Sequence, residues 1–121
     1  MNKKTIKERG KGLKLTGRLC VPCERGDGRL KPAEIKALRN ELGGKWKLTS
    51  GKQLEKSFEF PDFKLALKFT NRVGKIAEAQ NHHPDVSLSY GEVGIKLSTH
   101  SVKRLTENDF ILAAKIDALE A

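Results

Sequence analysis

The sequence has few of the residues on which small proteins depend for cross-links or metal sites. Its 121 residues include only two cysteines, one tryptophan, one tyrosine and one methionine. Cys20 and Cys23 form a single Cys-Val-Pro-Cys pair, and no second cysteine pair exists to complete a four-ligand zinc site. A half-site completed by histidine or by another chain stays open. The pair also lacks the strand and helix start that flank a thioredoxin-type redox centre, so we interpret it as two reduced thiols in a loop.

Long apolar segments are also lacking. No apolar run is long enough to span a bilayer, and no apolar core follows the basic start of the chain, which argues against a secretory signal. We therefore predict a cytoplasmic protein with no membrane partner, while the basic first residues leave organellar targeting open. A chain of 121 residues suits one domain with one core.

Positive charge is abundant but unevenly distributed. The net charge of the chain is +9. Residues 1–19 hold seven lysines and arginines and one acid, Glu8, so this segment carries +6 and the rest of the chain carries +3. We predict that residues 1–19 form a basic flexible tail and that residues 20–121 form the folded domain. A basic tail can attract nucleic acid. However, no aromatic side chains are interleaved to stack on bases, so we do not expect a nucleic-acid partner.

The spacing of apolar residues predicts three helices and four strands. The helices are expected over 32–42, 63–80 and from 107 onward, and the strands over 46–49, 54–60, 86–90 and 93–97. This αββαββα order predicts an α+β two-layer sandwich, a four-stranded antiparallel sheet covered by helices on one face. Pairing about Gly91 predicts that Ser89 lies opposite Val93 in the second hairpin.

The three histidines of the chain lie close together in the sequence, at His82, His83 and His100. Pro84 disfavours helical geometry at the residue before it, so the long helix should end at or just before the histidine pair. The hairpin that follows should bring its two ends to one sheet edge, where the three imidazoles can line one pocket. Imidazole has a reference pKa of about 6.5 and suits proton transfer near neutrality. Glu78, one helical turn before His82, can bind a substrate or orient a histidine.

Three interpretations of the histidines stay open from spacing alone. They can form an acid–base pocket, each can be a satisfied polar side chain, or they can hold zinc with water as the fourth ligand. Adjacent residues such as His82 and His83 usually point apart, which argues against the metal site. We rank the acid–base pocket first, the structural interpretation second and the metal site third.

A set of residues around the histidines follows a recognisable pattern. It comprises Glu78-Ala79-Gln80-Asn81-His82-His83-Pro84-Asp85, Tyr90, Thr99-His100, Leu105-Thr106 and Asp109, together with Phe58-Glu59-Phe60, Asp62-Phe63 and Cys20-Val21-Pro22-Cys23. This pattern resembles the signature of the pterin-4a-carbinolamine dehydratases, and the resemblance extends from residue 20 to the C-terminus. It implies the αββαββα fold and assembly through sheet edges into a homodimer or homotetramer.

The resemblance also implies an activity. It predicts a hydro-lyase that dehydrates 4a-hydroxytetrahydropterin to quinonoid dihydropterin with no metal or organic cofactor. This step recycles tetrahydrobiopterin and implies a functional link to an aromatic amino-acid hydroxylase. By position, His82 and His100 match the acid–base histidines and His83 the substrate-binding one. The predicted catalytic residues are His82, His83 and His100, and the predicted substrate-binding residues are Glu78, His82, His83, Pro84, Thr99, His100, Ser101 and Val102.

Asp109 has two interpretations, because it belongs to the signature and is also the third residue of a capping box opened by Thr106. We favour a supporting, structural role. Binding functions are the rival to catalysis: in animals, members of the family also act as dimerisation cofactors of a hepatocyte transcription factor, and other relatives assemble rubisco. The assembly relatives tend to lose the histidines, whereas this chain keeps all three, which favours an enzyme.

Overall fold

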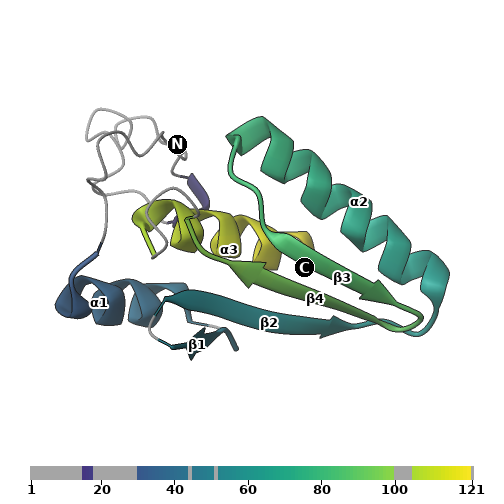
Figure 1. The fold of residues 1–121 in the computed structure, drawn as a ribbon. Helices are drawn as coiled ribbons and strands as arrows, with labels where there is room; N and C mark the ends of the chain where they lie inside the picture. The colour runs from purple at the N-terminus through teal and green to yellow at the C-terminus, as the bar shows by residue number, and fades with distance from the viewer. Residues whose placement is uncertain (1–14, 18–29, 44, 51, 100–104, 121) are drawn as a thin grey trace.

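The computed structural model describes residues 15–17, 30–43, 45–50, 52–99 and 105–120. Its elements, in chain order, are a 3-10 turn η2 (Leu15–Gly17), α1 (Pro32–Leu42), β1 (Lys47–Thr49), β2 (Gln53–Glu59), α2 (Phe63–Gln80), β3 (Asp85–Ser89), β4 (Glu92–Leu97) and α3 (Glu107–Glu120) (Figure 1). The predicted α+β fold and its αββαββα order are confirmed. Within the described ranges, no helix combines the length and the apolar character needed to cross a membrane.

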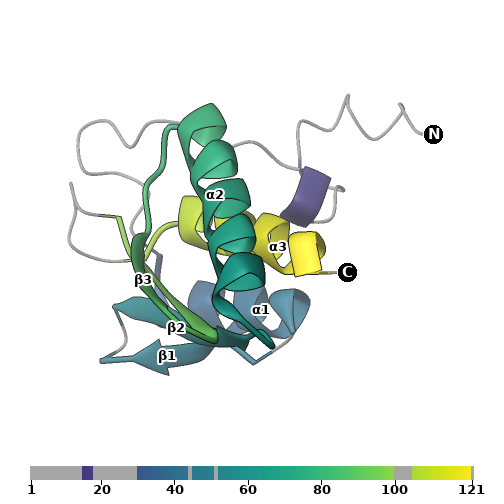
Figure 2. The same ribbon diagram turned by 90° about the vertical axis from the view of Figure 1, so that its right-hand side faces the viewer.

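The four strands form one antiparallel sheet in the order β1-β2-β4-β3. Alternate side chains of the two central strands are buried on one face: Leu54, Phe58, Val93, Ile95 and Leu97. Helices α2 and α3 pack on that face, and α1 lies beside α3 at the β1 end of the molecule (Figures 1 and 2). The residues that alternate with them are mostly polar and lie on the opposite face. The alternation of apolar and polar residues in the sequence therefore corresponds to the two faces of the sheet.

The register of the second hairpin differs by one residue from our prediction. Ser89 pairs with Glu92, whereas we expected it opposite Val93. The chain turns at Tyr90 and Gly91, not at Gly91 and Glu92. The prediction was wrong because the pattern of apolar residues fixes which side chains share a face, while the position of a two-residue turn also depends on its surroundings.

A backbone contact of Gly91 with Phe60 explains the position of the turn. The Phe60 N–H at the end of β2 donates to the Gly91 carbonyl at 2.8 Å, and a Cβ on Gly91 would lie 2.8 Å from the Phe60 carbonyl oxygen. Only glycine allows this close approach of the two backbones. The turn therefore begins at Tyr90, whose side chain is 68% exposed and does not lie on the buried face as its alternation with Val86 and Leu88 predicted.

Helix α3 occupies the centre of the helical layer. Our prediction placed one apolar stripe on it, Leu112, Ile116 and Leu119, but the helix buries residues on nearly every side over its first two turns. The additional buried residues are Phe110, Ile111, Ala113 and Ala114. Contacts with α1, α2 and η2 explain this burial, since a helix that is apolar all round must be covered on more than one side.

The short turn η2 packs against α3. Leu15 is only 3% exposed and belongs to the hydrophobic core, and the Lys115 ammonium donates to the Thr16 carbonyl at 2.8 Å. Leu15–Gly17 lies within the segment 1–19 that we predicted as a flexible tail, so this part of it is attached to the core. The division of the chain at residue 19 otherwise stays a prediction, because residues 1–14 and 18–29, with Cys20 and Cys23, lie outside the described residues.

A charged network connects β2 with the last turns of α3. Asp117 accepts hydrogen bonds from the Trp46 indole N–H at 2.9 Å and from the Lys56 ammonium at 2.7 Å. The Lys56 ammonium also lies 4.7 Å from the ring centroid of Phe58, within cation–π range. These contacts satisfy the polar atoms of a partly buried lysine and fix the plane of the tryptophan ring.

Candidate active site

The end of α2 positions the histidine pair. Asn81 adopts the left-handed conformation, with φ 53° and ψ 42°. Its N–H donates to the Glu78 carbonyl, and the His82 N–H donates to the Ala77 carbonyl, each at 3.2 Å. These two bonds form a Schellman motif, which ends the helix at Gln80 and turns the chain sharply. The predicted helix end before the histidines is thereby confirmed.

His82 is held by a buried carboxylate of another helix. Its Nε2 lies 2.7 Å from Oδ1 of Asp109, in the first turn of α3. The His82 side chain is 11% exposed and that of Asp109 is fully buried. A hydrogen bond to a charged, buried group is stronger than one at the surface, because little water competes for it. The pair therefore fixes the end of α2 against the start of α3.

The remaining acceptor positions of Asp109 are filled by threonines. The Thr99 hydroxyl donates to Oδ2 at 2.8 Å, and the Thr106 backbone N–H donates to the same oxygen at 3.0 Å. The Thr99 and Thr106 hydroxyl oxygens lie 2.7 Å apart. Since Thr99 uses its proton on Asp109, the Thr106 hydroxyl donates to Thr99. Asp109 thus caps the start of α3 and is also the hydrogen-bond partner of His82. Its capping role and its place beside the histidines are therefore properties of one carboxylate.

This arrangement specifies where the His82 ring can exchange a proton. An ionised carboxylate only accepts hydrogen bonds, so the neutral imidazole must carry its proton on Nε2. The other nitrogen, Nδ1, then has the free lone pair. Within the described residues, the hydrogen bonding of the ring runs through Nε2 alone. His82 can accept a proton at Nδ1, and the neighbouring carboxylate stabilises the cation that results.

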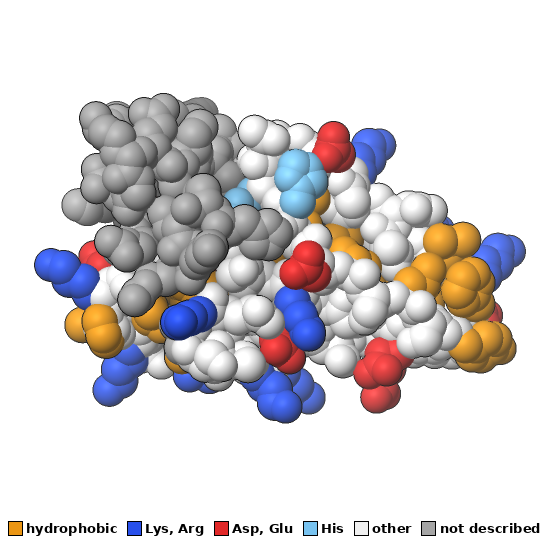
Figure 3. All heavy atoms as spheres, in the orientation of Figure 1, with side chains coloured by type: hydrophobic (Ala, Val, Ile, Leu, Met, Phe, Trp, Pro, Cys, Tyr) orange, Lys and Arg blue, Asp and Glu red, His pale blue; other side chains and the backbone are white. Residues whose placement is uncertain are grey.

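His83 is bonded to a different acid and lies nearer the surface. Its Nε2 is 2.5 Å from Oε2 of Glu78, and the two side chains are 54% and 78% exposed. Figure 3 shows histidine side chains (pale blue) reaching the surface. An exposed pair of this kind contributes little to stability. Both side chains are accessible to a ligand, and the two adjacent histidines have separate carboxylate partners.

The structure brings together part of the predicted site. His82, Thr99 and Asp109 form one connected cluster, and His83 with Glu78 forms a second pair at the same end of α2. Thr99 is buried and its hydroxyl is used internally, and Pro84 is half-buried. His100, Ser101 and Val102 lie outside the described residues.

Our sequence reasoning missed the side-chain bond between Thr106 and Thr99. The signal for it was a threonine, Thr99, that continues the buried alternation of 93–97, and a second threonine at the start of a capping box. Neither observation indicates that the two hydroxyls meet. Among the described residues, no three or more histidine, cysteine, aspartate or glutamate side chains are grouped as a metal site would require.

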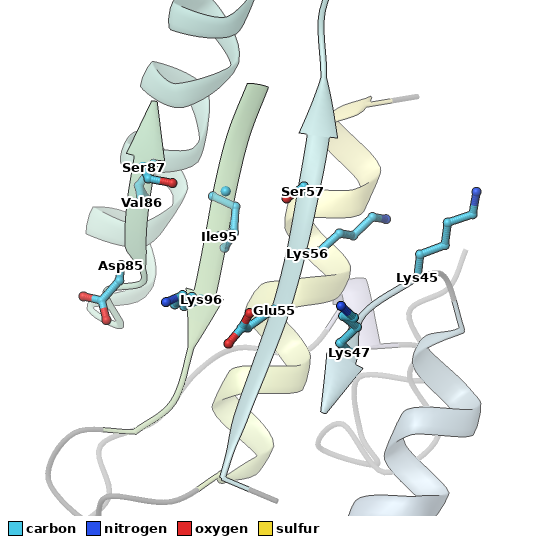
Figure 4. A pocket seen from close by; sticks show the side chains of 11 residues that line it. Lys45, Lys47, Glu55, Lys56, Ser57, Asp85, Val86, Ser87, Ile95 and Lys96 are labelled. Carbon is cyan, nitrogen blue, oxygen red and sulfur yellow. The ribbon is translucent and has the colours of Figure 1, made fainter. Parts of the chain in front are cut away.

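A hollow of about 450 Å³ lies on the open face of the sheet (Figure 4). Four charged residues of alternating sign occupy directly paired positions across the four strands: Lys47, Glu55, Lys96 and Asp85. Opposite charges at paired positions stabilise a sheet. We therefore interpret this hollow as sheet surface, because its four paired residues alternate in charge and it contains none of the predicted site residues.

Comparison with known proteins gives consistent matches. The family described as Pterin 4 alpha carbinolamine dehydratase matches residues 28–119. A protein of Alkaliphilus metalliredigens is 44% identical over 103 residues, which are 85% of this chain and 93% of that protein. A protein of Rubrobacter xylanophilus is 46% identical over 100 residues, 83% of this chain and 92% of that protein. The names of both give pterin-4-alpha-carbinolamine dehydratase as a provisional assignment.

Two solved structures share the fold. The one described as a transcriptional coactivator/pterin dehydratase from Brucella melitensis is 33% identical, with a TM-score of 0.71 over 77% of this chain and 99% of that chain. The other is a pterin dehydratase-like protein described as a RuBisCO assembly factor in the alpha-carboxysome. It is 22% identical, with a TM-score of 0.55 over 64% of this chain and 92% of that one, so it bears on the fold alone.

Proposed function

Because the chain belongs to the pterin 4 alpha carbinolamine dehydratase family, we propose that it dehydrates 4a-hydroxytetrahydropterin to quinonoid dihydropterin. The observation that carries this proposal is the His82–Asp109 pair, a nearly buried imidazole held by a fully buried carboxylate. The product would return to the pterin cycle of an aromatic amino-acid hydroxylase. The accessible His83–Glu78 pair at the same end of α2 supports a binding role beside it.

The reaction requires two proton transfers. One proton must reach the 4a-hydroxyl, so that the C4a–O bond breaks and water leaves. A second proton must leave the adjacent ring nitrogen, whose electron pair then forms the C=N double bond of the quinonoid product. The two transfers balance, and no electron acceptor is consumed. Two positioned imidazoles are sufficient for this chemistry, since each can donate or accept one proton near neutral pH.

We assign these transfers to His82 and His100, and substrate binding to His83 and Glu78. The hydrogen bond from His82 to Asp109 supports the first assignment, because it leaves Nδ1 for proton exchange and stabilises the imidazolium form. The Glu78 carboxylate can accept hydrogen bonds from the N–H groups of a pterin ring. We also propose Pro84, Thr99, Ser101 and Val102 as substrate-binding residues, as membership of the family implies.

The direct test is stopped-flow dehydration of chemically prepared 4a-hydroxytetrahydropterin. We expect the protein to accelerate the reaction over buffer alone, and we expect full activity after treatment with a strong chelator. The second expectation follows from the proposed chemistry, in which two imidazoles carry out both proton transfers and no metal ion is required. No acceleration would refute the proposed activity, and loss of activity that zinc restores would favour the three-histidine metal site.

We also propose that the chain forms a homodimer or homotetramer. Strand β3 is an edge of the sheet, and apolar side chains are exposed on it and along α2: Val86, Phe63, Leu65 and Leu67. An edge strand with exposed apolar neighbours favours pairing with a second copy. Light scattering coupled to size exclusion is expected to give two or four times the chain mass of 13.5 kDa. A single mass of one chain at micromolar concentration would contradict assembly.

A further inference from the structure

A second groove, unrelated to the histidines, lies between α1 and β1. It has a volume of about 510 Å³, and none of the residues that line it belongs to the candidate active site. Its apolar part is formed by Ile35 and Leu42 of α1 together with Trp46 and Leu48. Sites for small molecules usually have volumes of about 300–1,000 Å³ and largely apolar linings, and this groove falls within that range.

The apolar part of the groove is held in place before any ligand arrives. The Trp46 side chain is 4% exposed, and its indole N–H donates to Asp117 of α3 at 2.9 Å. Asp117 is fixed in turn by the Lys56 ammonium at 2.7 Å. A ligand therefore meets a ring whose orientation is already set, which lowers the entropy that binding would cost.

The rim of the groove is positively charged. Lys36 and Arg39 line it from α1, and both are exposed. The carboxylate of Glu34, on the same helix, accepts a hydrogen bond from the Lys31 backbone N–H at 2.8 Å. Within the described part of the chain the groove lining includes no acidic residue, and neither Lys36 nor Arg39 takes part in an ion pair. The two cations are available to a ligand.

We propose that this groove binds a small aromatic carboxylate, a ligand role separate from the proposed dehydratase activity. The ring packs against Trp46 and Ile35, and the carboxylate is bound by Lys36 and Arg39. A guanidinium can hold a carboxylate through two parallel hydrogen bonds, which makes arginine well suited to this part. The groove combines an apolar aromatic wall with two unpaired cations, and an aromatic monoanion complements both features at once.

The test uses the single tryptophan of the chain. Its indole N–H gives one side-chain cross-peak in the proton–nitrogen spectrum of the labelled full-length protein, so it can be followed without ambiguity. Naphthylacetate is the charged probe, and naphthylacetamide is the matched neutral one. We expect naphthylacetate to shift the Trp46 cross-peak with a Kd on the order of 1 mM. We expect the amide to bind about 3- to 10-fold more weakly, because it lacks the ion pairs.

Variants separate this site from nonspecific binding. In Lys36→Gln/Arg39→Gln the two probes should bind equally weakly. In Lys68→Gln/Arg72→Gln, which removes the same charges from exposed positions on α2, the preference for the carboxylate should persist. Ile35→Thr should weaken the binding of both probes about 4-fold, because apolar contact is lost. An unshifted Trp46 cross-peak at about 10 mM probe, or a carboxylate preference that survives in Lys36→Gln/Arg39→Gln, would overturn the proposal.

Discussion

Replacing His82 by glutamine is expected to lower kcat/KM for dehydration by about 10²–10⁴-fold, the range typical of a lost general acid or base. The glutamine amide can still donate a hydrogen bond to Asp109, so the buried carboxylate keeps a partner and the fold should remain intact. It cannot accept and release a proton, so the loss should appear mainly in kcat. His82→Ala should lose activity to a similar extent and also lose stability, because it leaves Asp109 without its imidazole partner.

His83→Gln is the matched control for this prediction. The two histidines are adjacent, but His83 is exposed and its partner is Glu78. If His83 binds the substrate, its replacement should raise KM more than it lowers kcat. The measurement is stopped-flow kinetics on both variants, with circular dichroism to verify folding. A folded His82→Gln protein with kcat within about 3-fold of the wild type would contradict proton transfer by His82.

Asp109→Asn is expected to reduce both stability and activity. The amide has nearly the same shape, but one of its two ends is a donor, whereas both carboxylate oxygens accepted hydrogen bonds: Oδ1 from His82, and Oδ2 from Thr99 and Thr106. Leaving buried donors unpaired should lower the free energy of unfolding by about 2–4 kcal/mol. Because Asp109 acts through His82 and not on the substrate, kcat should fall about 10- to 100-fold, as with other residues that orient a catalytic side chain.

The tautomer of His82 distinguishes this positioning role from a purely structural one. Nitrogen NMR of the ring should show the proton on Nε2 in the wild type and a redistribution toward Nδ1 in Asp109→Asn, since the carboxylate no longer requires a donor at Nε2. Asp62→Asn is the control: it makes the same change at the start of α2, where Asp62 accepts from the Leu65 N–H and asparagine caps equally well. That variant should keep the wild-type tautomer and kcat. An unchanged tautomer in Asp109→Asn would refute the positioning role.

The sequence predicted the elements well where their signals were local. Helix α2 has Asp62 at its start, a stripe of Ala66, Phe69, Val73 and Ala77 at spacings of three and four, and Pro84 shortly after its end. Each signal acts within one or two turns, so neighbouring residues suffice to specify the helix. The same reasoning failed at the β3–β4 turn, where the backbone of Phe60, the residue after β2, lies against Gly91.

The sequence by itself determined the αββαββα order, the two faces of the sheet and the placement of the histidine pair just beyond a helix end. These follow from periodicity, caps and turns, which depend on short stretches of chain. Only the tertiary structure decided that His82 meets Asp109. Asp109 is 27 residues from His82, and Trp46 is 71 residues from Asp117. Contacts at such separations form only when strands and helices pack together. The sequence contains several acidic residues, and local patterns do not indicate which of them packing brings to His82.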